Sequence, residues 1–182
     1  QEKLLKLAGQ IWLWSWKAVV TIGLLETQTF MHNEFLINNE LQAHKPGTSF
    51  HVARHTKKNL YALHDANSSL VRSRIVVEEG AELTFVEEFI ATGASFSSAL
   101  EIHVEKNGKL NYTQLQNLGV STQYNFEQKI TAEENADVQI TLVECGGAKG
   151  IVKQDIVCNG SGAKVECIGA CRGANSQEFD FL

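Results

Sequence analysis

Short apolar runs with alternating polar positions dominate the chain from about Phe35 onward, and clusters of Gly, Asn, Asp and Ser separate them. A period of two is typical of half-buried β-strands, and no helix-length pattern interrupts it. The first residues differ, because apolar side chains between residues 2 and 20 recur at helical spacing. These side chains are Leu4, Ala8, Ile11, Trp12, Trp16 and Val19. The pattern predicts a partly helical N-terminal segment over 1–34 and a strand-built domain over 35–182.

One arrangement of strand, corner and strand recurs four times, around the corners EEGA, KNGK, ENAD and NGSGA. The first apolar residues after the corners are separated by 27, 28 and 27 residues, and they are Leu83, Leu110, Val138 and Val165. Two places further on, the same strand face carries Phe85, Tyr112, Ile140 and Cys167. The strands before the corners carry Val77, Val104, Ala132 and Cys158 at one shared position. Because these columns recur together, we expect their side chains to form the core.

A repeat of this length cannot bury its apolar face alone and must stack on copies of itself. The repeat therefore predicts an all-β fold, a right-handed parallel β-helix with coils of about 27 residues stacked ~4.8 Å apart. A β-sandwich is the main alternative for so many short strands. The near-constant spacing favours the β-helix, because a sandwich built from hairpins has no reason to repeat in this way.

The corners explain the glycines, asparagines and carboxylates that recur with them. Each corner supplies Gly or Asn where the backbone turns sharply and positive φ is needed. Paired carboxylates can act as general acid and base, and two corners carry such pairs. These carboxylates are Glu78, Glu79, Glu133 and Glu134. Because they follow the period of the fold, we interpret them as solvated structural residues.

Composition and charge limit the classes of molecule that the chain is expected to bind. The 182 residues are 43% hydrophobic, which is enough for one domain with a substantial core. The net charge is −5, and the residues from Val71 onward include 9 basic and 16 acidic side chains, so nucleic acid is disfavoured as a partner. The longest apolar stretch, residues 11–25, is interrupted by Lys17 and is shorter than the ~20 residues of a membrane-spanning helix. We therefore expect no membrane partner.

The four cysteines all lie between residues 145 and 171, which is not the pattern of a disulfide framework and predicts a cytoplasmic protein. Cys158 and Cys167 belong to the apolar columns, so we expect them to pack in the core. Cys145 and Cys171 lie outside these columns, 26 residues apart, and should meet on adjacent coils. Two such thiols are candidate ligands for a soft metal or an iron–sulfur cluster. A purely structural role stays open for them, since no Cys-x-x-Cys motif is present.

Other residues with catalytic or ligating side chains give no coherent site. His51 and His55 have a helical spacing in a stretch that is predicted to be strand and loop, so a zinc pair is not expected. His64 and the remaining histidines are interpreted as ordinary polar residues. The segment CGGAKG at 145–150 lacks the spacing of a phosphate-binding loop and is interpreted as a turn between strands.

The stretch from Leu60 to Leu182 resembles the core of the SufB/SufD family, the β-helical subunits of the SUF iron–sulfur cluster assembly complex. The resemblance is carried by LHDANSSLVRSRIVVEEGAELTFVEEF, LEIHVEKNGKLNYTQLQNL and GACRGANSQEFDFL. It implies a non-enzymatic scaffold that pairs, as homo- or heterodimer, with a SufB-like or SufD-like subunit and acts with a SufC-type ATPase. It also implies a transient iron–sulfur cluster and no firmly bound cofactor.

The chain is more similar to SufD, because it shows no cysteine motif typical of the amino-terminal part of SufB. The family's His-Gly-Ala-Thr segment and its SufC-docking helices have no counterpart in the matched stretch, so no residue here is assigned to ATPase docking. Two other classes stay open as alternatives. A β-helical carbohydrate-active enzyme would need clustered Asp, Arg or Lys in a groove on successive coils, and an adhesin would need export.

Overall fold

The computed structural model describes residues 34–37, 40–43, 48–64, 70–90, 92–174 and 176–182. Every regular element in these residues is a β-strand, and they contain no helix that is long and apolar enough to cross a membrane. The predicted N-terminal segment and its helix lie outside the described residues, except for Glu34. The strands are β1 (Glu34–Ile37), β2 (Glu40–Ala43), β3 (Thr48–Val52), β4 (Lys57–His64), β5 (Leu70–Val77), β6 (Glu82–Phe89), β7 (Ser95–Val104), β8 (Lys109–Gln116), β9 (Gln123–Ala132), β10 (Asp137–Glu144), β11 (Lys149–Cys158), β12 (Lys164–Cys171) and β13 (Glu178–Phe181).

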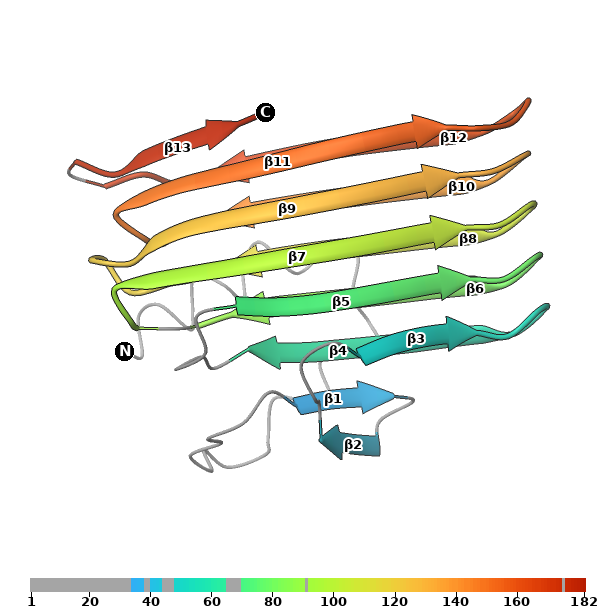
Figure 1. The fold of residues 1–182 in the computed structure, drawn as a ribbon, viewed down its shortest axis with the longest axis horizontal. Coiled ribbons are helices and arrows are strands. Elements are labelled where there is room, and N and C mark those ends of the chain that lie inside the picture. Colours follow the sequence, from blue (N-terminus) through green and yellow to red (C-terminus); the bar gives the residue numbers. More distant parts are fainter. Residues whose placement is uncertain (1–33, 38–39, 44–47, 65–69, 91, 175) are drawn as a thin grey trace. The chain divides into compact units, whose positions relative to one another are not determined.

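The strands form two sheets, and from β3 onward the chain alternates between them (Figure 1). Sheet A has the order β12-β10-β8-β6-β4-β1-β2, and sheet B has the order β13-β11-β9-β7-β5-β3. All neighbouring strands from β3 onward are parallel. One strand of each sheet therefore makes one coil, and the fold is a parallel β-solenoid of about five turns with coils of about 27 residues. The predicted architecture is confirmed.

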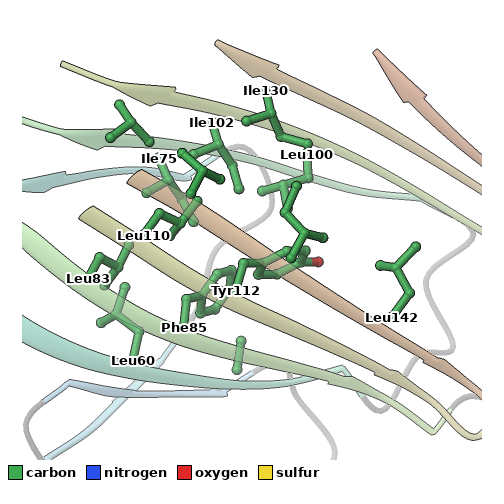
Figure 2. Close-up of a cluster of buried hydrophobic side chains, with 14 of the residues drawn as sticks. Leu60, Ile75, Leu83, Phe85, Leu100, Ile102, Leu110, Tyr112, Ile130 and Leu142 are labelled. Carbon is green, nitrogen blue, oxygen red and sulfur yellow. The ribbon is translucent and has the colours of Figure 1, made fainter. Parts of the chain in front are cut away.

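The register matches the predicted columns. Leu83 lies opposite Leu110, Leu110 opposite Val138, and Val138 opposite Val165 on the strands of sheet A. In sheet B, Ile75, Ile102 and Ile130 form an equivalent ladder. Figure 2 shows Leu83 and Leu110 of the first ladder, and the three isoleucines of the second, pointing into the space between the sheets. Repeating the same apolar residue type on successive coils thus builds a continuous core.

The corners adopt the left-handed conformation that their composition predicts. Each corner between a strand of sheet B and the following strand of sheet A contains one residue with a positive φ. This residue lies three places before the first inward-facing residue of the strand in sheet A. These residues are His55 (55°), Gly80 (65°), Asn107 (57°), Asn135 (55°) and Gly162 (74°). The first of them makes a fifth corner that the sequence pattern did not reveal, since neither Gly nor Asn stands there. Backbone bonds join the corners, such as that from Gly80 N to Lys106 O at 3.0 Å.

Charges on the outer face of sheet A alternate along one column of the register. Glu82 lies between Lys57 and Lys109, and its carboxylate oxygens are 3.1 Å from each ammonium nitrogen. Asp137 and Lys164 continue the column on the next two strands. Because like charges on directly opposite positions would repel, this alternation favours the observed register.

A hairpin ends sheet A at the side of the first coil. β1 pairs antiparallel with both β2 and β4, whereas every other neighbouring pair is parallel. The hairpin occupies the free edge of β4 and so prevents that edge from pairing with another chain. The sequence pattern did not predict this hairpin.

Candidate functional site

Polar side chains occupy several inward positions in the middle of the solenoid. They come from five of its strands and are at most 3% exposed. They are His64, Glu87, Gln114, Gln116, Gln128 and Glu144. Since burying a polar group without a partner is costly, their hydrogen bonds decide whether they are compatible with the fold.

The chain of hydrogen bonds begins at the first coils. His64 Nε2 is 2.8 Å from Glu87 Oε1, and the His64 ring stacks on Phe89 with the ring centroids 4.7 Å apart. The Tyr112 hydroxyl donates to the other oxygen of Glu87, at 2.7 Å. Glu87 is therefore held on both sides by groups from the neighbouring coils.

Amide side chains carry the network to the later coils. Gln128 donates to the Tyr112 hydroxyl at 3.4 Å and also to Gln114 Oε1. Gln114 Nε2 donates in turn to Glu144 Oε1 at 2.9 Å. Gln154 donates to Gln128 Oε1 at 2.8 Å, which extends the network to β11. An unbroken set of hydrogen bonds thus links β4 with β10 through the interior.

Glu144 ends the network at the last residue of β10. Its Oε2 accepts a hydrogen bond of 2.7 Å from the Tyr124 hydroxyl. Cys145 follows Glu144 in the chain, and Cys171 lies opposite Glu144 on β12. The neighbouring Gln116 fixes the turn, because its Oε1 accepts from the backbone N–H groups of Cys145 at 3.1 Å and Gly146 at 2.8 Å.

The electrostatics favour neutral groups at this end of the network. Burial raises the pKa of Glu144, although the hydrogen bonds from Tyr124 and Gln114 oppose this effect. Burial and the Glu144 carboxylate raise the pKa of Tyr124 far above its ordinary value, so its hydroxyl remains a donor. Burial, followed by the Glu144 charge, also raises the pKa of the Cys145 and Cys171 thiols.

The glycines of the segment CGGAKG make room for this arrangement. A Cβ atom on Gly150 would lie 1.9 Å from Tyr124 Cζ, and one on Gly146 would lie 2.1 Å from the Leu118 carbonyl oxygen. Gly147 has a φ of 83°. Residues 145–148 connect β10 and β11, as predicted, whereas Lys149 and Gly150 already belong to β11. Gly147 and Gly150 leave the space that Tyr124 occupies when it reaches Glu144.

Most of the predicted core is buried. The predicted side chains that are at most 2% exposed are Leu83, Phe85, Leu110, Tyr112, Val138 and Ile140. Val165 is half-buried against this core. Cys158 and Cys167 were expected in the core, and this was wrong, because both are exposed. They occupy inward columns of the last described coil. Within the described residues β12 has a neighbour only on its β10 side, and β13 pairs with β11 only at residues 149–152, so no further strand covers Cys167 or Cys158.

The structure places Cys145 and Cys171 on adjacent coils, where Cys171 lies opposite Glu144, the residue before Cys145. Within the described residues, no group of three or more His, Cys, Asp and Glu side chains is arranged to hold a metal ion. Their role as ligands therefore stays a prediction that rests on two thiols.

The corner carboxylates form hydrogen bonds and ion pairs with residues of neighbouring coils. Glu78 accepts from the Arg54 backbone N–H at 3.1 Å, and Glu79 lies 3.5 Å from the Arg54 guanidinium. Glu134 accepts from Lys106 Nζ at 2.9 Å, and Glu133 accepts from Asn159 at 3.3 Å. These contacts are structural and agree with the interpretation of the carboxylates as corner residues.

A groove on the outer face of sheet B was not expected from the sequence. Four successive strands line it with one column of alternating charge. The column comprises Arg74, Glu101, Lys129 and Asp155. Neither sign of charge dominates it.

The buried polar network was also missed, and His64 in particular is fully buried rather than an ordinary surface residue. The alternation of inward and outward side chains along each strand could have revealed this network. Glu87 and Gln114 lie four places after Leu83 and Leu110, on the same face of their strands. Polar residues at positions that the columns mark as inward indicate an interior hydrogen-bond network.

Comparison with known proteins identifies the family. A family model described as "SUF system FeS cluster assembly, SufBD core domain" matches residues 59–182, which is more than half of the chain. The match spans the coils from β4 onward and includes the whole interior network. No curated protein and no solved structure matches the chain significantly. The chain belongs to the SufBD core domain family of the SUF iron–sulfur cluster assembly system.

Proposed function

We propose that this chain is a scaffold subunit of the SUF complex, which pairs with a second β-helical subunit and acts with a SufC-type ATPase. The observation that carries the proposal is the coincidence of the SufBD core match with the coils of the solenoid. The interior supports a scaffold, because its polar groups bond one another across successive coils. The partner is SufB-like or SufD-like, and the sequence favours SufD for this chain.

Exposed apolar side chains near the last described coil support the pairing. Apolar side chains are exposed on β12 and β13. Ile168 is 56% exposed and Phe181 is 46% exposed. Exposed apolar side chains are typical of surfaces that bind another protein.

The iron–sulfur cluster is the cargo of the complex in this proposal and not a resident cofactor of the chain. Cys145 and Cys171 are the candidate ligands, because two thiols on adjacent coils suit a soft metal. The free cysteines support a reducing, cytoplasmic setting.

The test is co-purification of the full-length protein with tagged SufB-like and SufC-type partners of the same organism under anaerobic conditions. We expect a stable complex, and we expect Ile168→Asp to weaken it while the outward-facing Glu166→Gln does not. Failure of the full-length protein to bind either partner would contradict the proposal.

The groove of sheet B favours a carbohydrate-active enzyme as the second candidate. It carries cations and carboxylates on successive coils, as such an enzyme requires. Release of reducing ends from acidic polysaccharides would support this alternative. We expect none, because the matched family is a family of assembly scaffolds.

A further inference from the structure

The corner between β11 and β12 is one residue longer than the equivalent corners of the preceding coils. Residues 159–163 connect these two strands, whereas four residues stand at each of the other corners, 53–56, 78–81, 105–108 and 133–136. The strands on both sides of the longer corner stay in register with the previous coil, so the corner itself accommodates the additional residue. This residue lies in the sequence Asn159-Gly160, one of the two Asn-Gly pairs of the chain.

Hydrogen bonds identify the additional peptide group. In the preceding corner Glu133 has two roles, because its N–H bonds the previous coil at 2.9 Å and its carbonyl oxygen accepts from Ala136 N at 3.0 Å. In the longer corner these roles are divided. The N–H of Asn159 bonds the previous coil at 2.8 Å, whereas Gly160 O accepts from Ala163 N at 3.3 Å. The N–H of Gly160 is therefore the additional donor, and it has no hydrogen-bond partner among the residues that the structure describes.

The second Asn-Gly pair provides an internal comparison. Asn107-Gly108 stands in a corner of ordinary length, where Gly108 is buried and its N–H donates to Glu105 O at 2.9 Å. Gly160, in contrast, is half-buried, and Asn159 is exposed. A buried, hydrogen-bonded amide reacts only after local opening of the structure. The amide of Gly160 is available in the folded state.

Packing requires the glycine of the longer corner. A Cβ atom at position 160 would lie 2.4 Å from the backbone nitrogen of Glu134 and 2.6 Å from its Cα atom, which is closer than folded proteins allow. Glycine is thus the residue that this corner accommodates. Because glycine has no side chain, its backbone nitrogen is also the least shielded from the preceding asparagine.

We propose that Asn159 is a site of spontaneous modification, at which the side-chain amide is converted to a carboxylate through a cyclic imide. The deprotonated backbone nitrogen of Gly160 attacks Cγ of Asn159, a new C–N bond forms, and ammonia leaves. Water then opens the ring at either carbonyl carbon, which gives aspartate or isoaspartate. The conversion consumes water and releases ammonia, and neither an oxidant nor a reductant takes part.

The reaction replaces a hydrogen bond by a repulsion. Asn159 Nδ2 donates to Glu133 Oε1 at 3.3 Å, and the product would place a second carboxylate beside that of Glu133. Isoaspartate also adds a methylene group to the backbone of the corner. Both products therefore weaken the contact between two successive corners. The inference concerns this corner and does not depend on the proposed role in cluster assembly.

The experiment incubates the full chain at mildly alkaline pH, in ordinary water and in water enriched in heavy oxygen, followed by peptide mapping by mass spectrometry. We expect Asn159 to react on the order of tenfold faster than Asn107, because burial and one hydrogen bond protect the amide that follows Asn107. The new carboxylate should contain heavy oxygen, and isoaspartate should accompany aspartate. Asn159→Gln should abolish the product at this corner and leave the reaction of Asn107 unchanged.

The same incubation in denaturant is the control, because both Asn-Gly pairs then lose the surroundings that distinguish them. We expect the two asparagines to react at similar rates in the unfolded chain. Equal rates in the folded chain, faster reaction at Asn107, a difference that persists in denaturant, or a product without heavy oxygen would overturn the proposal.

Discussion

The Tyr124 hydroxyl donates a 2.7 Å hydrogen bond to Glu144 Oε2 inside the solenoid, from β9 in sheet B to β10 in sheet A. This bond satisfies a carboxyl group that is 0% exposed and joins the two sheets at the point where the polar network reaches the thiols.

Replacing Tyr124 with Phe removes the donor and leaves a buried acceptor of Glu144 without its partner. We expect a loss of about 1–3 kcal/mol in the free energy of unfolding. Urea unfolding monitored by circular dichroism provides the measurement. The half-exposed Tyr61, whose hydroxyl bonds Glu88 on the outer face, provides the control variant Tyr61→Phe, and its loss should be smaller. Equal losses would argue against the importance of the buried bond.

Replacing Gly150 with Ala places a Cβ atom 1.9 Å from Tyr124 Cζ and forces the ring away from Glu144. We expect destabilisation by at least about 2 kcal/mol, because the ring is closely packed. Gly169→Ala is a matched control, since nothing lies within 4 Å of its Cβ position. Its effect on the midpoint of thermal unfolding should be close to zero. A tolerant Gly150→Ala variant would contradict the close contact.

The raised pKa of Glu144 predicts a specific dependence of stability on pH. A carboxyl group whose pKa is higher in the folded than in the unfolded protein contributes stability below the unfolded pKa. That contribution is lost as pH rises from the ordinary value of 4.5 through the higher pKa of the folded state. Urea midpoints of the wild type and Glu144→Gln, measured across this range, should therefore diverge, with the wild type falling more steeply. Glu166→Gln, on the exposed face of β12, should follow the wild type, and parallel curves for all three proteins would refute a raised pKa.

The alternating column on sheet A predicts that charge order affects stability. Replacing Glu82 with Lys would put three cations side by side at positions 57, 82 and 109. We expect destabilisation that decreases when salt is added, because the column is exposed and salt screens exposed charges. The neutral variant Glu82→Gln should show a weaker effect and a weaker dependence on salt. Unfolding midpoints at low and high salt measure both.

The sequence predicted the coils because the same residue types recur at one position in each of them. Leu83, Leu110 and Val138 marked the inward face correctly, since burial in a solenoid follows from alternation and stacking. The corner at His55 was missed because its left-handed residue is neither Gly nor Asn. Cys167 was misplaced because its burial depends on a neighbouring coil and not on its column.

The candidate site was harder to predict than the fold. The hydrogen bond between Tyr124 and Glu144 joins residues of different sheets, and no periodic pattern relates two positions across the interior. His64 and Glu87 were open to prediction as polar residues on an inward face, but their pairing depends on side-chain positions that the register alone does not determine. The adjacent positions of Cys145 and Cys171, in contrast, followed from their separation by nearly one coil.

The measurement that tests the proposed scaffold function most directly is anaerobic cluster formation by the reconstituted complex. The full-length protein is combined with its SufB-like or SufD-like partner and a SufC-type ATPase, then supplied with iron, a sulfide source and ATP. We predict iron–sulfur absorption and bound iron that increase several-fold over a mixture lacking this chain. Equal cluster formation with and without the chain, in a mixture whose other components are active, would contradict its role in assembly.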